Sequence, residues 1–325
     1  MRELRYIWAI NEALGEEMER DPNVFIVGED VGLPGGAFGA TRGLVDRFGP
    51  ERVIDTPISE AAIMGLAAGA ASNGLRPVVE IMFMDFMTMC MDGVVNQIAK
   101  MRYMFGSQFS MPLVIRTPAG AGLHAGPQHS QSLEAWFAHI PGLKVVMPAT
   151  PYDVKGILKA AIRDDNPVLV IEHKALHALK GEVPEQEYVL PIGKAFTKRQ
   201  GTDVTIVATS RMVHEALKAA EELEKRGISV EVIDLLSISP WDKSAVFESV
   251  SKTHRLVIAQ EAVKNFGAGS EIAATVAEEI LDELDAPIIR VGAPFVPVPF
   301  ALEEVYLPDA LHIVKAIETI MKKSF

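Results

Sequence analysis

Short apolar runs alternate with amphipathic stretches along most of the chain. The amphipathic pattern is clearest in residues 151–163, where Val154, Ile157, Leu158 and Ile162 recur at helical spacing. The apolar runs end at polar or glycine-rich segments, which is typical of strands buried on both faces. Strands that alternate with helices predict parallel sheets covered by helices. The predicted strands are residues 24–27, 77–82, 112–116, 144–147, 166–171, 204–208, 230–233, 256–259 and 288–291, and the predicted helices are residues 5–20, 60–72, 87–105, 133–139, 151–163, 212–226, 268–284 and 309–322.

The alternation is interrupted once, by a polar segment rich in glycine, proline and glutamate that spans residues 174–202. A chain of 325 residues also favours two domains over one. We therefore expect an α/β fold of two three-layer parallel-sheet domains, over residues 1–178 and 203–325, with a linker at 179–202. Residues 294–299 contain three prolines, which remove ladder donors, so we expect an extended connector there.

Composition excludes several classes of function. The net charge of −12 argues against nucleic acid or an anionic membrane surface as the main partner. No apolar stretch reaches the 18 residues that a membrane-spanning helix needs. Cys90 is the only cysteine and the N-terminus does not resemble a signal peptide, so we expect a reducing, cytoplasmic setting.

Glu60 stands at the start of an unusual predicted helix. Ser59 before it is a good N-cap residue, whose hydroxyl is expected to accept from a free amide of the first turn. Gly65 and Gly69 lower the helix propensity of this segment, and close approach of another backbone is the usual reason for such glycines. Taken alone, Glu60 favours the positive end of the helix dipole and nothing more.

The familiar cofactor motifs are weak or missing. Residues 120–125 (GAGLHA) match a dinucleotide-binding pattern only loosely, and there is no phosphate-binding loop or nucleophile elbow. Phe86 and His129 instead follow predicted strands. With Glu60, they lie just past the carboxyl ends of parallel strands or at the loops beside them, the sheet edge where open α/β folds bind ligands. His129 is either a proton carrier or an ordinary hydrogen-bonded loop histidine. Residues 164–167 (DDNP) are a turn signal that could also hold a hard cation.

Seven motifs, in order along nearly the whole chain, carry a family resemblance. The chain closely resembles the beta subunit of the thiamine-diphosphate-dependent decarboxylase component of 2-oxo acid dehydrogenase complexes. Residues 80–86 (EIMFMDF) and 100–105 (KMRYMF) most resemble the acetoin dehydrogenase branch. The seven motifs are residues 28–31 (GEDV), 55–60 (DTPISE), 74–77 (GLRP), 128–131 (QHSQ), 141–146 (PGLKVV), 162–167 (IRDDNP) and 203–207 (DVTIV).

The resemblance implies a pyrimidine-binding domain followed by a transketolase C-terminal domain. It implies that Glu60 binds the aminopyrimidine of thiamine diphosphate and promotes the tautomer that removes the thiazolium proton. Ile58 would line the pyrimidine pocket and Phe86 would stack on the ring. His129 would face the substrate and assist acyl transfer to a lipoyl group. A structural potassium ion would be held by Leu113, Ala161, Ile162, Asp164 and Asn166.

The resemblance also implies partners. The subunit would act as an alpha2-beta2 heterotetramer, with Mg and the diphosphate bound mainly by the alpha chain. This sequence lacks the Gly-Asp-Gly of that site, as expected for a beta chain. A lipoyl acyltransferase core would dock on the C-terminal domain, and the substrate would be pyruvate, a branched-chain 2-oxo acid or acetoin.

Two other interpretations stay open from the sequence. The chain could be a non-catalytic docking module that keeps the fold, or the C-terminal half of a split transketolase or deoxyxylulose-phosphate synthase. The presence of both Glu60 and His129 favours an enzyme subunit, and the QHSQ and GLRP segments favour the dehydrogenase family.

Overall fold

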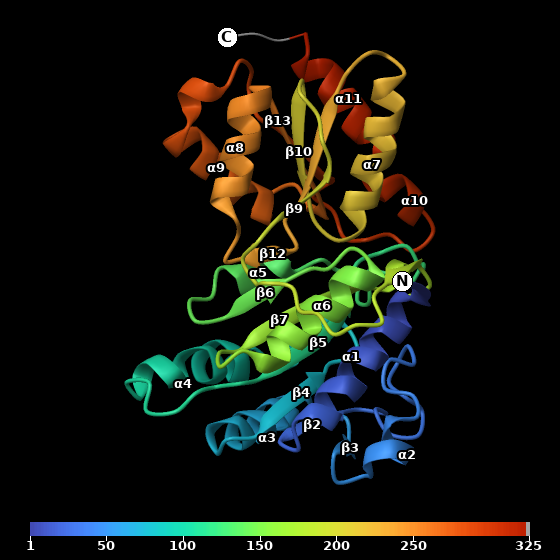
Figure 1. Cartoon of the computed structure of the whole chain (residues 1–325), viewed down its shortest axis with the longest axis vertical. Coiled ribbons are helices and arrows are strands. Elements are labelled where there is room, and N and C mark those ends of the chain that lie inside the picture. Colours follow the sequence, from blue (N-terminus) through green and yellow to red (C-terminus); the bar gives the residue numbers. More distant parts are fainter. Residues whose placement is uncertain (323–325) are drawn as a thin grey trace. The chain divides into compact units, whose positions relative to one another are not determined.

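The computed structural model describes residues 1–322 and separates into two units (Figure 1). Unit 1 comprises Met1–Ala119 and Trp136–Ile192. Unit 2 comprises Gly120–Ala135 and the chain from Gly193 onward. The short segment 120–135 therefore belongs to unit 2, although unit 1 precedes and follows it in the sequence.

The main sheet of unit 1 is parallel, as the apolar runs predict. Its strands lie in the order β6-β7-β5-β4-β2-β3. Strands β2, β5 and β7 are buried along their whole length, which requires cover on both faces. A separate antiparallel pair joins β1 to β8. The bounds are β1 Arg2–Arg5, β2 Val24–Gly28, β3 Val53–Asp55, β4 Arg76–Glu80, β5 Val114–Ala119, β6 Lys144–Val146, β7 Val168–His173 and β8 Lys180–Val183.

Helices α1 (Tyr6–Arg20) and α6 (Pro151–Arg163) lie side by side in unit 1 (Figure 1). Buried lysines of α6 meet carboxylates of α1, with Lys155 Nζ and Lys159 Nζ at 2.6 and 2.7 Å from the two oxygens of Glu16. Helix α3 (Glu60–Ser72) packs on β4 and ends at Asn73 and Gly74, as predicted. The shorter helices are α2 (Leu44–Phe48) and α5 (Glu134–Ala138), of which α5 begins in unit 2.

The helix predicted for residues 87–105 forms, but not as one regular α-helix. The chain forms a 3-10 helix at Met84–Cys90, a π-helix at Gly93–Ile98 and a short α-helix, α4, at Ala99–Met104. A Cβ added at Gly93 would lie 3.1 Å from Met64 Cβ of α3. Gly93 therefore lies close to α3, where a larger residue would crowd Met64.

Unit 2 has its own five-stranded sheet, in the order β14-β13-β10-β11-β9. All neighbours are parallel except the edge strand β9, which is antiparallel to β11. Helices α7 and α11 pack together on one side, and α8 and α9 pack against β10 and β13 (Figure 1). The bounds are β9 Phe196–Arg199, β10 Val204–Ala208, α7 Arg211–Glu224, β11 Val230–Asp234, β12 Ser237–Ser239, α8 Lys243–Thr253, β13 Leu256–Val263, α9 Ala268–Glu279, β14 Ile289–Ala293, α10 Glu303–Tyr306 and α11 Ala310–Ile320.

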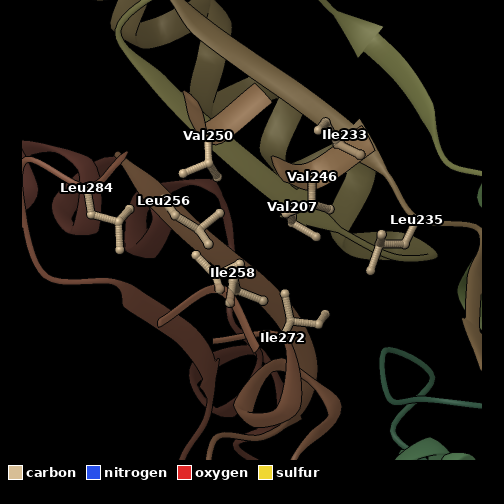
Figure 2. Close-up of a cluster of buried hydrophobic side chains, with 10 residues drawn as sticks. Val207, Ile233, Leu235, Val246, Val250, Leu256, Ile258, Ile272 and Leu284 are labelled. Carbon is tan, nitrogen blue, oxygen red and sulfur yellow. The ribbon is translucent and has the colours of Figure 1, made fainter. Parts of the chain in front are cut away.

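Figure 2 shows the apolar core of unit 2 between the sheet and its helices. Side chains of β10, β11 and β13, among them Val207, Ile233 and Ile258, gather with Val250 of α8 and Ile272 of α9. Val207, Ile233, Ile258 and Ile272 belong to predicted strands and helices, whereas α8, which carries Val250, was not predicted.

Part of the predicted linker is regular structure. Residues 180–183 form β8 and belong to unit 1, whereas residues 196–199 form the edge strand β9 of unit 2. Residues 294–299 form no helix or strand, as their prolines predict. Within residues 1–322, no helix is long and apolar enough to cross a membrane.

Candidate active site

The carboxyl ends of β2, β3 and β4 bring acidic residues together in unit 1. Gly28 pairs with Asp55 of β3 and with Glu80 of β4, so the three strands end at one edge. Glu29 follows β2 directly, and Glu60 begins α3, which follows β3. The edge predicted from the sequence is therefore formed, and Glu60 lies at it.

Glu60 is half-buried in the first turn of α3, as predicted. The predicted cap is wrong, because the Ser59 hydroxyl makes no capping hydrogen bond. The Ser59 backbone N–H instead donates to Glu29 Oε1 at 3.2 Å. This bond holds the segment before Glu60 against the end of β2.

Glu29 is the acidic residue that sequence reasoning did not single out. It is 6% exposed. Burial raises the pKa of its carboxyl, and the charges of Glu60 and Asp30 raise it further, against the hydrogen bond from Ser59. The Glu60 charge also contributes, after burial, to raising the pKa of the Cys90 thiol to about 12. Two interacting carboxyls therefore lie at the mouth of α3. The sequence feature that could have identified Glu29 is an acidic residue placed directly after a buried strand.

Phe86 is half-buried in the 3-10 helix that follows β4. Its ring lies 5.5 Å from that of Phe83 in an edge-to-face arrangement, and Phe83 contacts Phe38 of the glycine-rich loop in the same way at 5.7 Å. Ile58 is 83% exposed. Unit 1 thus offers a carboxylate from Glu60, an uncovered apolar side chain from Ile58 and an aromatic ring from Phe86.

A buried ion network lies beneath this edge. Arg116 of β5 is 1% exposed and donates to Glu80 at 2.8 Å and to Glu172 of β7 at 2.7 Å. Glu80 also lies against the glycine-rich loop, because a Cβ added at Gly36 would fall 2.4 Å from Glu80 Oε1. The network therefore fixes the strand ends and leaves Gly36 no room for a side chain.

A groove of about 420 Å³ runs beside α3 and is lined by small and methionine side chains, including Met64, Gly65, Gly69 and Met89. A Cβ added at Gly65 or Gly69 would meet no atom of the chain within 4 Å. The close backbone contact predicted for these glycines is not made within residues 1–322, so the groove is open to a second molecule.

His129 lies in the segment that belongs to unit 2. β5 ends at Ala119 and this segment follows at once, so sequence reasoning expected His129 at the edge that holds Glu60. His129 is half-buried, and its backbone N–H donates to Gly126 O at 3.3 Å. The structure thus brings Glu60, Ile58 and Phe86 together in unit 1, whereas His129 is a residue of unit 2.

The side chains predicted to hold a cation already have partners. Asp164 forms an ion pair with Lys144 and accepts from the Asn166 N–H at 2.9 Å. Lys144 and Asn166 together lower the pKa of the Asp164 carboxyl, although burial opposes them. Asn166 Oδ1 accepts from Arg102 Nη1 at 2.7 Å. The Asp164 carboxylate and the Asn166 amide oxygen are therefore already engaged by Lys144 and Arg102.

Each carbonyl oxygen predicted for the same site accepts one hydrogen bond. Leu113 accepts from Val168 N–H at 2.9 Å, Ala161 accepts from Asp164 N–H at 3.2 Å, and Ile162 accepts from Arg76 at 3.0 Å. Each carbonyl keeps one lone pair. As arranged, the side chains do not fit a metal ion, so the potassium site stays a prediction. Among residues 1–322, no group of three or more His, Cys, Asp or Glu side chains could hold a metal.

Comparison with known proteins covers both units. The family model of the transketolase pyrimidine-binding domain matches residues 2–179, and that of the transketolase C-terminal domain matches residues 193–313. Among solved structures, the chain is similar to a split gene transketolase described as an inactive beta4 tetramer. The TM-score is 0.81, the identity is 27%, and 98% of each chain is covered.

Three relatives from Bacillus subtilis (strain 168) are named for different substrates. The chain is 51% identical to 2-oxoisovalerate dehydrogenase subunit beta, over 93% of each chain. It is also 51% identical to the beta subunit of acetoin:2,6-dichlorophenolindophenol oxidoreductase, over 94% of each. It is 46% identical to pyruvate dehydrogenase E1 component subunit beta, over 99% of this chain and 100% of that one.

Proposed function

The chain belongs to the family of beta subunits of thiamine-dependent 2-oxo acid and acetoin dehydrogenases, and we propose that Glu60 is its cofactor-activating residue. The reaction we propose is oxidative decarboxylation of pyruvate or a branched-chain 2-oxo acid, with acyl transfer to lipoyl groups of an acyltransferase core. The observation that carries the proposal is the Glu60 carboxylate at the mouth of α3, next to a second carboxyl and to open apolar surface.

The residues of unit 1 fit the pyrimidine half of thiamine diphosphate. When bound, this cofactor supplies a thiazolium carbon that adds to the substrate carbonyl. Glu60 would hold a proton at a ring nitrogen of the pyrimidine, Phe86 would stack on the ring, and the exposed Ile58 would be covered by it.

Glu29 strengthens this assignment. Because its pKa is raised, Glu29 accepts a proton more readily than an ordinary carboxyl, and it lies against the segment that carries Glu60. We propose that Glu29 positions Glu60, because it accepts a hydrogen bond from the backbone N–H of Ser59, the residue directly before Glu60.

We further propose that an alpha chain covers this site and supplies the Mg and diphosphate contacts, in an alpha2-beta2 heterotetramer. The relatives are named beta subunits, which implies an alpha partner. The open groove beside Gly65 and Gly69 is shaped for close approach of another backbone.

Glu60→Gln tests the proposal in the complex reconstituted with an alpha chain, thiamine diphosphate and Mg²⁺. We expect turnover and exchange of the thiazolium proton to fall about 100-fold or more, since general acid–base catalysis contributes that much. Glu51→Gln, an exposed change in the same unit, should leave both rates unchanged. Unchanged proton exchange in Glu60→Gln would show that Glu60 does not activate the cofactor.

Cleavage of acetoin is the second candidate activity, because a relative of equal identity oxidises acetoin. Rates with pyruvate, 2-oxoisovalerate and acetoin, measured with the same complex and a dye acceptor, would separate the candidates. A complex that forms but turns over none of the three would favour the non-catalytic docking module.

We propose that His129 assists transfer of the acyl group to the lipoyl acceptor. His129→Ala should lower acylation of lipoamide much more than dye-linked decarboxylation, because the dye bypasses the acyl acceptor. Equal loss of both rates, or of neither, would contradict this role.

A further inference from the structure

The segment that carries His129, residues 120–135, is bound to the rest of unit 2 through the first residues of the segment. It is closed at its base, where Gly120 N–H donates to Gln131 O at 3.3 Å. Ala121 is 1% exposed and packs with Val298, Tyr306 and Leu307 in a small apolar cluster. The amides of this segment meet two carboxylates of the same unit.

The first carboxylate is Glu261, near the end of β13. Its Oε1 accepts from Ala121 N–H at 2.9 Å, and its side chain is 9% exposed. Its Oε2 accepts from Arg211 Nη1 at 3.1 Å, and Arg211 also donates to Pro308 O at 3.3 Å. Glu261 therefore links the segment to α7 and to the chain after α10.

The second carboxylate is Glu303, the first residue of α10. Its side chain is 1% exposed, and its Oε2 accepts from His124 N–H at 2.7 Å. His124 has a positive φ of 51°, a conformation that a non-glycine residue keeps only when its surroundings hold it. Its ring Nδ1 lies 2.9 Å from Phe300 O, so side chain and backbone are held together.

The second half of the segment lines a pocket of unit 2. A pocket of about 490 Å³ lies against Gln128, Ser130 and Leu133, with Phe295 and Val298 among its other walls. The buried Ser130 hydroxyl has no hydrogen-bond partner among residues 1–322. The hydrogen bond from Gly120 to Gln131 joins this half to the start of the anchored half, so the positions of the two halves are coupled.

We propose that Glu261 and Glu303 are positioning residues for His129, acting through the amides of Ala121 and His124. Hydrogen bonds from amides to buried carboxylates are short and strong, and they fix the backbone five residues before His129. The proposal rests on the role proposed above for His129. It makes unit 2 responsible for the geometry of acyl transfer, whereas Glu60 of unit 1 is untouched by it.

The test compares two rates in the reconstituted complex, acylation of lipoamide and dye-linked decarboxylation. Glu261→Ala and Glu303→Ala should lower acylation by up to about 100-fold, the loss expected from a 1 Å misplacement, with a much smaller loss of decarboxylation. Glu303→Gln keeps an acceptor oxygen and should recover part of the acylation rate, and it also serves if the alanine variant does not fold. Glu304→Ala removes an exposed carboxylate from the same helix and is the matched control, which should change neither rate.

Hydrogen exchange supplies a readout that is independent of turnover. The amide of His124 should lose protection in Glu303→Ala and that of Ala121 in Glu261→Ala, whereas both should stay protected in Glu304→Ala. If His129→Ala separates the two rates but the alanine variants of Glu261 and Glu303 do not, the positioning role is overturned. An equal fall of both rates in these variants overturns it too. If His129→Ala does not separate the rates, the proposed role of His129 fails first and the positioning role fails with it.

Discussion

Glu134 is a buried carboxyl without the hydrogen bonds that such a group needs. It begins α5, is 2% exposed, and its Oε2 has no partner among residues 1–322. It lies in a small cavity with Val207 of β10 and Ile258 of β13. Burial raises the pKa of its carboxyl to about 7, and the Glu261 charge adds to the rise, against the hydrogen bond from its own amide.

The raised pKa fixes the sign of a pH effect on unfolding. A carboxyl with a folded pKa of about 7 and an ordinary pKa of 4.5 binds its proton more tightly in the folded state. Its contribution to stability is complete below about pH 4.5 and is lost as the pH rises to about 7. At 1.36 kcal/mol for each pKa unit, the loss is about 3 kcal/mol. Glu134→Gln cannot ionise, so at pH 8 it should be more stable than the wild type by up to about 3 kcal/mol, and at pH 5 the difference should be below about 1 kcal/mol.

Urea unfolding from pH 5 to pH 8 measures the effect. In a background with Trp8→Phe and Trp136→Phe, the remaining Trp241 reports on unit 2. Glu304→Gln, at an exposed position, should keep the wild-type pH dependence. If Glu134→Gln also follows the wild-type curve across this range, Glu134 ionises without penalty and its burial does not raise the pKa as argued.

Two further predictions concern unit 1. Arg116→Met should lower the free energy of unfolding by about 3–5 kcal/mol, because it leaves Glu80 and Glu172 buried without a cation. Urea unfolding followed through the tryptophans of unit 1 checks this, and an unchanged midpoint would contradict it. Gly36→Ala should be more destabilising than Gly43→Ala by about 1 kcal/mol or more. Both glycines have a φ near +78°, but only at Gly36 would the new Cβ meet Glu80, so equal losses in thermal unfolding would refute the contact.

The periodic part of the fold follows from the sequence. Buried parallel strands and amphipathic helices leave strong patterns, so α6 and strands such as β10 were predicted nearly to the residue. The short elements, among them β3 and α2, were missed, because such short segments cannot show a hydrophobic period. The helix predicted over residues 87–105 forms as successive 3-10, π and α segments, a mixture that the hydrophobic period did not predict.

The candidate site was predictable only in part. Glu60 could be found because a carboxylate at the start of a small-residue helix is a local feature. The contact between Glu29 and Ser59 joins residues that meet only once β2 and β3 pair, so no local pattern contains it. Likewise, no pattern in residues 120–135 predicts their contacts with Glu261 and Glu303, which lie more than 100 positions later in the sequence.

The interleaving of the two units has a consequence during synthesis. The chain passes from one unit to the other at residues 119–120, 135–136 and 192–193. A ribosome that adds about 5–20 residues per second makes the amide of His124 on the order of ten seconds before its acceptor, Glu303. Once β7 has been made, the nascent chain holds β2 to β7 of unit 1, while the amide of His124 still lacks its acceptor Glu303. A product that ends early, after Ile192, would therefore keep the carboxylate and leave the histidine untethered.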